Sequence, residues 1–289
     1  MMGIQQISQE LGIGVDSLRI WERRYGFPTP QRDRRGHRSY PHEQVEELRL
    51  VKKLRDMGQR PGTIFSLTPN QRRGLLEKLV AEQTPGSSNL RYLATEMPMV
   101  EIAPALRQVF ETSGLYDFIL ESAVPLLKIL GLGWADGSIN IAREHVISDL
   151  LEDLISREMA SQQPASGPRI LFLTLSGERH RLGLLLAAAL FQQQGCEPVL
   201  IQEDLPLREV SPLADELKVA AVALSFSSHF QSTQAKKSLV SLRKILDPRI
   251  GLIAGGGGIE NCPYLAGISL CCDLGQIPLL WKKEFVAQG

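Results

Sequence analysis

The sequence predicts a multidomain chain that is helical in its N-terminal part and of the α/β class in its C-terminal part. At 289 residues it is long enough for two or three domains that each have a core. Apolar residues recur at helical spacing through most of the first 163 positions. From Arg169 onward, short apolar runs alternate with longer helical runs, a pattern typical of a parallel sheet with helices on both faces.

The composition is that of an ordinary globular protein, with 43% hydrophobic and 22% charged residues. No apolar run is long enough to span a membrane, and the N-terminus lacks the basic and apolar regions of a signal peptide. We therefore expect a cytoplasmic protein. The cysteines have no CxxC spacing, which favours structural thiols over a zinc site or a disulfide framework. They are Cys196, Cys262, Cys271 and Cys272.

The net charge of zero is divided unevenly along the chain. Residues 1–79 contain 15 Lys and Arg against 9 Asp and Glu, whereas residues 80–289 contain 17 against 23. The basic N-terminal part is therefore the candidate for binding a polyanion such as nucleic acid.

Two short helices joined by a glycine-containing turn are predicted at the N-terminus. Apolar residues of GIQQISQELG share one face of a first helix, and the glycines of GIGV end it. The second helix, VDSLRIWERRYG, starts at Val15 or Asp16, can turn Leu18 and Trp21 inward and leaves its arginines in solvent. This is the outline of a helix-turn-helix, whose second helix enters the major groove of DNA.

The segment FPTPQRDRRGHRSY has the prolines, glycine and polar residues of a short hairpin with a basic tip. Beside a recognition helix such a hairpin is a wing, whose arginines would bind phosphates, while Arg19 and Arg23 are better placed for base edges. The alternative is a solvated basic face, and for Trp21 and Tyr40 we expect a core role to dominate. The candidate DNA-binding residues are Ser17, Arg19, Arg23, Arg24, Tyr25, Arg35, His37, Arg38 and Tyr40.

LRIWERRYG followed by RRGHRSY resembles the winged helix-turn-helix of MerR-type transcription regulators, because both elements occur in order at the expected separation. PHEQVEELRLVKKLRDMG, started by Pro41, and LTPNQRRGLLEKLVAEQ continue as helices. In MerR regulators a helix in this place pairs two chains, so the resemblance implies a dimer on a double-stranded DNA operator. Metal-sensing members carry cysteines around that helix. This sequence has none before Cys196, which implies an effector other than a thiolate-bound metal.

The predicted domain boundaries follow from composition and periodicity. The winged helix-turn-helix with its following helix spans 1–83, and TPGSSN at 84–89 is a short linker. A bundle of about four helices is predicted at 90–166, and a Rossmann-like, flavodoxin-like domain at 167–289.

The predicted bundle contains Trp134 at a helix end and the pair Glu144 and His145 early in the next helix. Taken singly, such a Trp is more often a core residue, and such a pair is more often a surface or capping feature. Nine residues separate Trp134 from Glu144. This spacing resembles the helical cap of light-sensing, cobalamin-dependent MerR regulators, in which the Trp covers the upper face of the corrin.

A polar motif follows the first predicted strand, where ligands bind in parallel sheets. Glu178-x-His180-x-x-Gly183 resembles the cobalamin-binding signature Asp-x-His-x-x-Gly, which continues with 41 residues, Ser-x-Leu, about 27 residues and Gly-Gly. Here 41 residues separate Gly183 from Ser225, and 27 separate Ser227 from Gly255. No GxGxxG follows the first strand, so a dinucleotide site is not indicated.

The resemblance implies that His180 is an axial ligand of cobalt and that Glu178 orients its imidazole. It also implies that Ser225 hydrogen-bonds the displaced dimethylbenzimidazole tail, which would pass beside Gly255 and Gly256. The complete set of candidate cobalamin-binding residues is Trp134, Glu144, His145, Glu178, His180, Gly183, Ser225, Ser227, Gly255 and Gly256.

The sequence departs from these patterns at three positions. Glu178 replaces the usual Asp, and Ser227 replaces Leu. Ala135 follows Trp134, where the light-sensing regulators carry a histidine that captures cobalt after photolysis. The last departure bears on the light response more than on cobalamin binding.

The leading hypothesis is a cytoplasmic MerR-type repressor, not an enzyme, that binds adenosylcobalamin. By resemblance the cofactor would drive dimers to assemble further, to a tetramer, and to bind operator DNA, and light would reverse this as in a photoreceptor. One alternative is a regulator whose C-terminal domain does not use cobalamin and instead mediates oligomerisation or partner binding. Another is a corrinoid methyl carrier, against which the winged helix argues, as does the lack of a segment long enough for a catalytic barrel.

Overall fold

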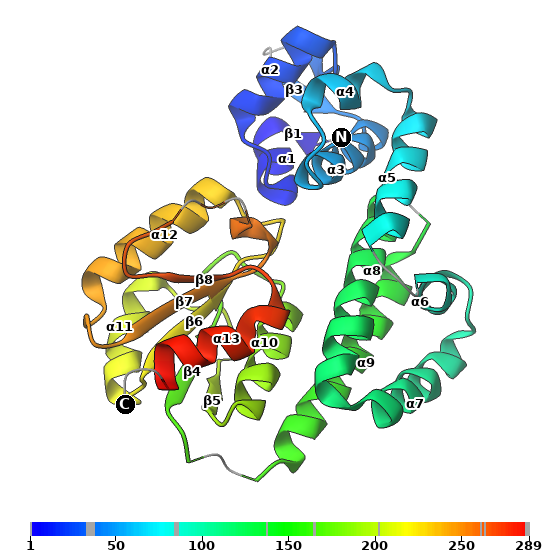
Figure 1. Cartoon of the computed structure of the whole chain (residues 1–289). Helices are drawn as coiled ribbons and strands as arrows, with labels where there is room; N and C mark the ends of the chain where they lie inside the picture. The colour runs from blue at the N-terminus through cyan, green and yellow to red at the C-terminus, as the bar shows by residue number, and fades with distance from the viewer. Residues whose placement is uncertain are drawn as a thin grey trace. The chain divides into compact units, whose positions relative to one another are not determined.

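The computed structural model describes residues 2–32, 38–83, 87–136, 138–163, 166–201, 203–260, 262 and 264–286 (Figure 1). The chain falls into two compact units, each described here by itself. The first contains Met1–Thr112 and Glu121–Leu150, and the second contains Ser113–Leu120 and Leu151–Gly289. The division into domains at 83, 90 and 166 stays a prediction.

The first unit begins with two short helices and a small antiparallel sheet whose strand order is β1-β3-β2. These elements are β1 (Met2–Gly3), α1 (Ile4–Leu11), α2 (Val15–Tyr25), β2 (Gln31–Arg32) and β3 (Arg38–Tyr40). Gly12 and Gly26 follow the two helices with φ values of 61° and 70°, a left-handed conformation that favours glycine. The predicted helix-turn-helix and hairpin are confirmed, whereas the pairing of β1 with β3 was not predicted.

The core beneath α2 has the predicted inward residues. Leu18 is fully buried, Trp21 is 4% exposed and Tyr40 is fully buried. They pack with apolar residues of α1 and of α3 (His42–Asp56), so the recognition helix rests on a core that is continuous with the next helix. The helix α3 starts one residue after Pro41, which occupies the position before the first helical turn.

The remainder of the first part of the chain is helical. Its helices are α4 (Pro61–Ser66), α5 (Pro69–Gln83), α6 (Ser87–Thr95), α7 (Met99–Asp117), the π-helical turn η1 (Phe118–Ala123), α8 (Val124–Asp136) and α9 (Ile141–Ser161). Leu132 of α8 packs against the core that includes α3. Arg143 anchors the start of α9 to α6 and the turn after it. Its guanidinium donates to the carbonyls of Leu93, Ala94 and Met97 at 2.6–2.7 Å.

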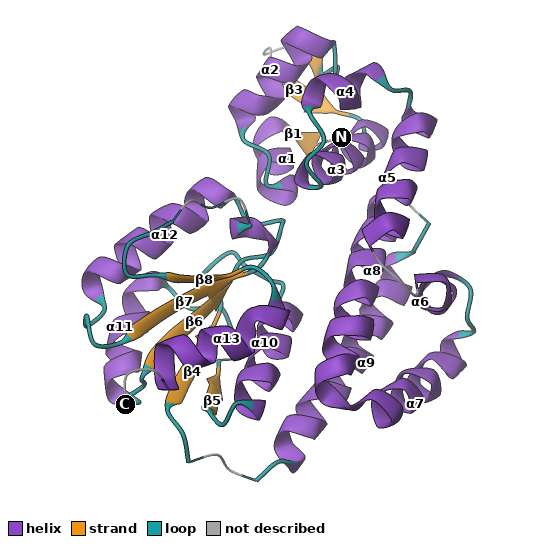
Figure 2. Cartoon of the chain, in the orientation of Figure 1, coloured by secondary structure: helices purple, strands orange, loops and turns teal. Residues whose placement is uncertain are grey.

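The C-terminal unit contains a five-stranded parallel sheet in the order β5-β4-β6-β7-β8 (Figure 2). The strands are β4 (Arg169–Leu173), β5 (Glu197–Leu200), β6 (Ala221–Ser225), β7 (Gly251–Gly255) and β8 (Ser269–Cys271). The helices are α10 (Leu182–Gln193), α11 (Leu207–Glu216), α12 (Ser232–Ile245) and α13 (Ile277–Trp281), with shorter turns η2 (Gly257–Ile259), η3 (Leu274–Gln276) and η4 (Lys282–Val286). This is the flavodoxin-like strand order, as predicted, with β8 and α13 added beyond the predicted elements.

Helices cover both faces of this sheet, and successive strand residues therefore face different helices. Leu171 and Leu173 of β4 belong to the core that includes α11 and α12. Phe172 points the other way, and its ring lies 5.7 Å from that of Phe191 in α10, which in turn contacts Trp281 of α13. Burial on both faces explains why the strands are continuous apolar runs in the sequence rather than alternating ones.

Within the described ranges, every helix is too short or too polar to pass through a lipid bilayer.

Candidate functional site

The order of the strands places a switch point of the sheet at β4. Strand β4 has β5 on one side and β6 on the other, and ligands of open α/β sheets bind outside the carboxyl ends of strands at such a switch point. The loop after β4 carries Glu178 and His180, the end of β6 carries Ser225, and the loop after β6 carries Ser227. The structure therefore brings together four of the predicted residues at this edge.

The carboxylate of Glu178 joins the two loops. Its side chain is 1% exposed, one oxygen accepts a hydrogen bond from the backbone N–H of His180 at 2.9 Å, and the other accepts from the N–H of Ser227 at 2.7 Å. Burial alone would raise the pKa of Glu178, but these hydrogen bonds and one to the His180 ring lower it below its ordinary value. Glu178 is therefore ionised at neutral pH.

The ionised carboxylate also fixes the tautomer of His180. Nδ1 of His180 lies 3.0 Å from Glu178 Oε1, and a carboxylate can only accept, so in the neutral imidazole Nδ1 carries the proton and Nε2 has the lone pair. The His180 side chain is 57% exposed, and Nε2 has no hydrogen-bond partner in the part of the chain that the structure describes. This is the arrangement of a metal-ligating histidine with an orienting carboxylate.

A second histidine, His229, lies against His180 and was missed in the sequence. The two rings are stacked, with centroids 4.7 Å apart and planes inclined by 17°. Ser227 Oγ lies 3.2 Å from His180 Nδ1 and accepts a hydrogen bond from the N–H of His229 at 3.3 Å. The sequence signal that could have identified it is its position, four residues after the motif serine Ser225 and in the loop that follows.

The glycines of the motif divide into two kinds. A methyl group on Gly255 would lie 2.6 Å from the carbonyl oxygen of Cys271, and one on Gly256, whose φ is 94°, would lie 2.3 Å from that of Phe226. The protein's own backbone thus requires both glycines. A methyl group on Gly183 would meet Ser225 Oγ at 3.8 Å, an ordinary contact, so packing within the protein does not require glycine there.

Replacing Glu178 with Gln is expected to change the pH dependence of stability. The pKa of Glu178 is lower in the folded protein than in the unfolded chain, where it is about 4.3, so its contribution is present above that value and is lost as the pH falls through the folded pKa. The wild type should therefore lose more stability than Glu178→Gln below about pH 5. Hydrogen exchange of the β4 and β6 amides measures this, and equal pH slopes would contradict an ionised Glu178.

The predicted residues of the helical segment lie in α8 and α9. Trp134 is in the last turns of α8, and its side chain is outside the described residues. His145 Nδ1 lies 2.6 Å from Glu144 Oε2, and the His145 side chain is 69% exposed. Neither caps α9, because Asn140 does so by accepting from the N–H of Arg143 at 2.8 Å. The roles of Trp134, Glu144 and His145 toward cobalamin stay predictions.

The recognition helix presents most of its predicted residues to solvent. Arg19, Arg23 and Arg24 are exposed, and Ser17 is half-buried. Arg19 is 3.5 Å from the exposed carboxylate of Asp16, a contact too solvated to hold it away from a polyanion. Three arginines on one exposed helix face form a surface that can contact phosphates and base edges.

Two residues predicted to bind DNA from the wing are engaged within the protein. Arg38 Nε donates to Glu22 of α2 at 3.0 Å, which ties β3 to the recognition helix. Tyr40 is fully buried, which contradicts the prediction of a DNA contact and agrees with the core role that was expected to dominate. The other two wing residues, Arg35 and His37, lie outside the described residues.

An aromatic cluster holds the recognition helix against α4 and α5, and we name it the Phe65 cluster. The ring of Phe65 stacks on Tyr25 with centroids 4.5 Å apart and meets the edge of Trp21 at 5.4 Å. Phe27 lies 6.2 Å away, and the guanidinium of Arg72 lies 5.6 Å from the ring. Tyr25, which was predicted to contact DNA, is thus half-buried in this cluster.

The match to known proteins begins at this end of the chain. Residues 2–68 match the family of MerR HTH family regulatory proteins. The N-terminal part is a MerR-type helix-turn-helix domain. Its helices α1 and α2 and its wing are those described above, and the matched range ends two residues after α4, so it includes Phe65 but not Arg72.

Two curated relatives from Myxococcus xanthus align with most of the chain. The HTH-type transcriptional repressor CarH is 25% identical over 266 residues, covering 88% of this chain and 89% of the relative. The HTH-type transcriptional repressor CarA is 29% identical over 232 residues, covering 77% of this chain and 75% of the relative.

Solved structures resemble the chain more distantly. The methanol:cobalamin methyltransferase complex MtaBC from Methanosarcina barkeri matches with a TM-score of 0.36 and 16% identity, over 71% of this chain and 82% of that one. A cobalamin-binding protein from Desulfitobacterium hafniense DCB-2 matches with a TM-score of 0.33 and 13% identity, over 67% and 95%.

The four cysteines all lie in the C-terminal unit. The cysteines are free thiols, and burial together with Glu197 raises the pKa of Cys196 to about 12, consistent with the predicted structural role. Cys271 is also buried, but Cys272 is exposed. The described ranges contain no group of three or more His, Cys, Asp or Glu side chains able to hold a metal ion by themselves.

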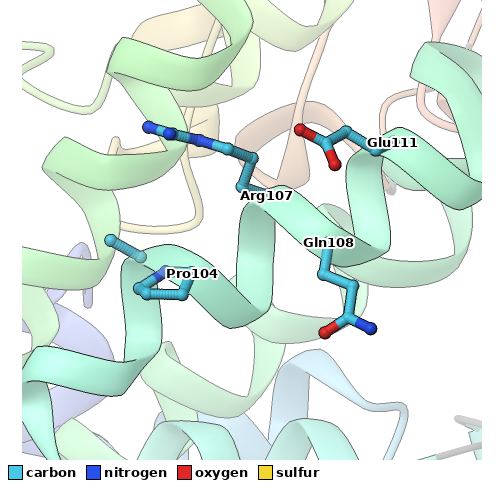
Figure 3. Close-up of a pocket in the computed structure, with 5 residues that line it drawn as sticks. Pro104, Arg107, Gln108 and Glu111 are labelled. Carbon is cyan, nitrogen blue, oxygen red and sulfur yellow. The ribbon is translucent and has the colours of Figure 1, made fainter.

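A shallow hollow lies along α7, lined by Ala103, Pro104, Arg107, Gln108 and Glu111 (Figure 3). Arg107 and Glu111 project from the same side of the helix. Because all the lining residues belong to one helix, the hollow is an open helix face and not an enclosed binding site.

Proposed function

We propose that the protein is a DNA-binding transcription regulator, a repressor, whose C-terminal domain binds cobalamin through His180. The observation that carries the proposal is the Glu178–His180 pair at the switch point of the sheet. An ionised, buried carboxylate holds the proton on Nδ1 and leaves the Nε2 lone pair for a metal. The pair belongs to a chain that begins with a MerR-type domain and is similar over most of its length to two proteins named as repressors.

The residues at the sheet edge fit a corrinoid. When bound, cobalamin would supply a cobalt ion that can accept an imidazole nitrogen, and a light-sensitive bond. His180 would hold the cobalt through Nε2, and Glu178 would orient its imidazole. Ser225 and Gly183 would contact the dimethylbenzimidazole tail of the cofactor. Packing within the protein does not explain why residue 183 is a glycine, and room for the tail would explain it. Trp134, Glu144 and His145 are proposed contacts from the helical segment.

The finer parts of the proposal concern the form of the cofactor and the signal. We take adenosylcobalamin as the cofactor, a dimer that assembles further as the DNA-binding form, and a cytoplasmic location. Ala135 cannot ligate cobalt, so any light response must proceed without a protein ligand at that position.

The test is the visible absorption spectrum of the full-length protein mixed with adenosylcobalamin in the dark, desalted and then illuminated. A retained corrin spectrum of the histidine-ligated type supports the proposal, and a change on illumination supports adenosylcobalamin and light as the signal. If the cofactor is lost on desalting, the cobalamin part is wrong. The domain would then be an oligomerisation or partner-binding module.

The DNA-binding part is tested at Arg23. Duplexes selected from a random pool by the wild type provide the operator, and Arg23→Ala is expected to bind it about 5- to 150-fold more weakly, as loss of one base-edge arginine costs about 1–3 kcal/mol. Selectivity should relax at one base position. Arg107→Ala, which removes an exposed arginine of α7, is the control. Equal affinity and an unchanged selected sequence would show that Arg23 does not read bases.

A further inference from the structure

His229 is the group at the sheet edge to which the cobalamin motif assigns no role. Its ring covers the ring of His180 at a centroid distance of 4.7 Å and an angle of 17°. The loop that carries it is fixed to the same cluster, because the Ser227 N–H binds Glu178 and the His229 N–H donates to Ser227 Oγ. The stacked pair is therefore held from both loops.

The hydrogen bond to Glu178 does not by itself fix the plane of the His180 imidazole. It holds Nδ1 at 3.0 Å from a carboxylate oxygen, while the terminal torsion of a histidine side chain is broad and the side chain is 57% exposed. A ring packed on the face of the imidazole restricts that torsion, as offset stacking of aromatic rings does elsewhere. Ser227 Oγ lies 3.2 Å from the same Nδ1 atom, whereas His229 packs on the face of the ring.

We propose that His229 is a positioning residue that sets the ring plane of His180 and so prepares Nε2 for axial ligation. The inference rests on the proposed function and deepens it. Because the rings meet face to face, the contribution of His229 comes from its flat aromatic surface and not from a nitrogen lone pair. A residue with the same flat surface and no nitrogen should therefore replace it.

The experiment compares His229→Ala with His229→Phe in the full-length protein. Equilibrium binding of adenosylcobalamin in the dark gives the dissociation constant, and the absorption spectrum at saturation gives the fraction with histidine ligation. His229→Ala is expected to bind roughly 2- to 10-fold more weakly and to reduce the histidine-ligated fraction, whereas His229→Phe should restore both. In the cofactor-free protein, the ring-proton chemical shifts of His180 should move in His229→Ala and return toward the wild type in His229→Phe.

His42→Ala is the matched control, since it removes an exposed histidine at the start of α3. Wild-type values for His229→Ala would overturn the inference. Weak binding in both variants would also overturn it, because the imidazole nitrogens and not the ring face would then matter. If the wild type itself holds no cobalamin, the proposed function fails and the inference fails with it.

Discussion

His180→Ala is expected to remove the histidine-ligated spectrum of the cobalamin-loaded protein and to release the cofactor on desalting. The substitution deletes the nitrogen whose lone pair Glu178 leaves open. Glu178→Gln should have a smaller effect, about 10- to 100-fold in affinity, because loss of an orienting partner weakens a ligand without removing it. The measurements are the visible spectrum and the dissociation constant in the dark.

The order of these effects is the informative part of the comparison. If His180→Ala retains a histidine-ligated spectrum, another histidine is the ligand, and the double variant His180→Ala/His229→Ala identifies or eliminates the stacked neighbour. If Glu178→Gln binds cobalamin as tightly as the wild type, the hydrogen bonds of the carboxylate stabilise the loops but do not affect how His180 ligates cobalt. His145→Ala examines the predicted contribution of the helical segment in the same assay.

The spacing of the motif residues along the chain predicted which residues meet at the candidate site, because these residues follow strands that are neighbours in the sheet. Glu178 and His180 follow the first strand and Ser225 ends the third, and the flavodoxin-like order makes those two strands neighbours. The spacing could not predict the hydrogen bonds that these side chains make to the neighbouring loop. The carboxylate of Glu178 reaches the amide of Ser227 across the loops, and this depends on the register of β4 with β6.

Very short elements, and contacts that depend on how neighbouring elements pack, were not predicted from the sequence. Strand β8 has three residues at the edge of the sheet, and α4 has six, so neither contains enough positions for a periodic pattern. The charge of Arg38 predicted a DNA contact, but its pairing with Glu22 depends on how β3 packs on α2.

Arg72→Ala is expected to destabilise the MerR-type domain by about 3–5 kcal/mol, the usual consequence of leaving one partner of a buried ion pair without the other. Arg72 is 7% exposed, its Nη1 lies 2.6 Å from Glu47 Oε1, and its Nε donates to the carbonyl of Ile64 at 2.8 Å. The measurement is hydrogen exchange of the α3 and α4 amides in the full-length protein. Arg73→Ala, one residue along and exposed, should change stability by no more than about 0.5 kcal/mol.

The same substitution should weaken DNA binding although Arg72 is too buried to reach DNA. Its guanidinium packs on Phe65, which stacks on Tyr25 at the end of the recognition helix, so loss of the arginine loosens the support of α2. Arg72→Met combined with Glu47→Leu replaces the ion pair with apolar side chains and should recover most of the stability. If this double variant also recovers operator affinity, the Phe65 cluster acts by packing. If stability returns without affinity, the charge of Arg72 or Glu47 itself contributes to the DNA-binding surface.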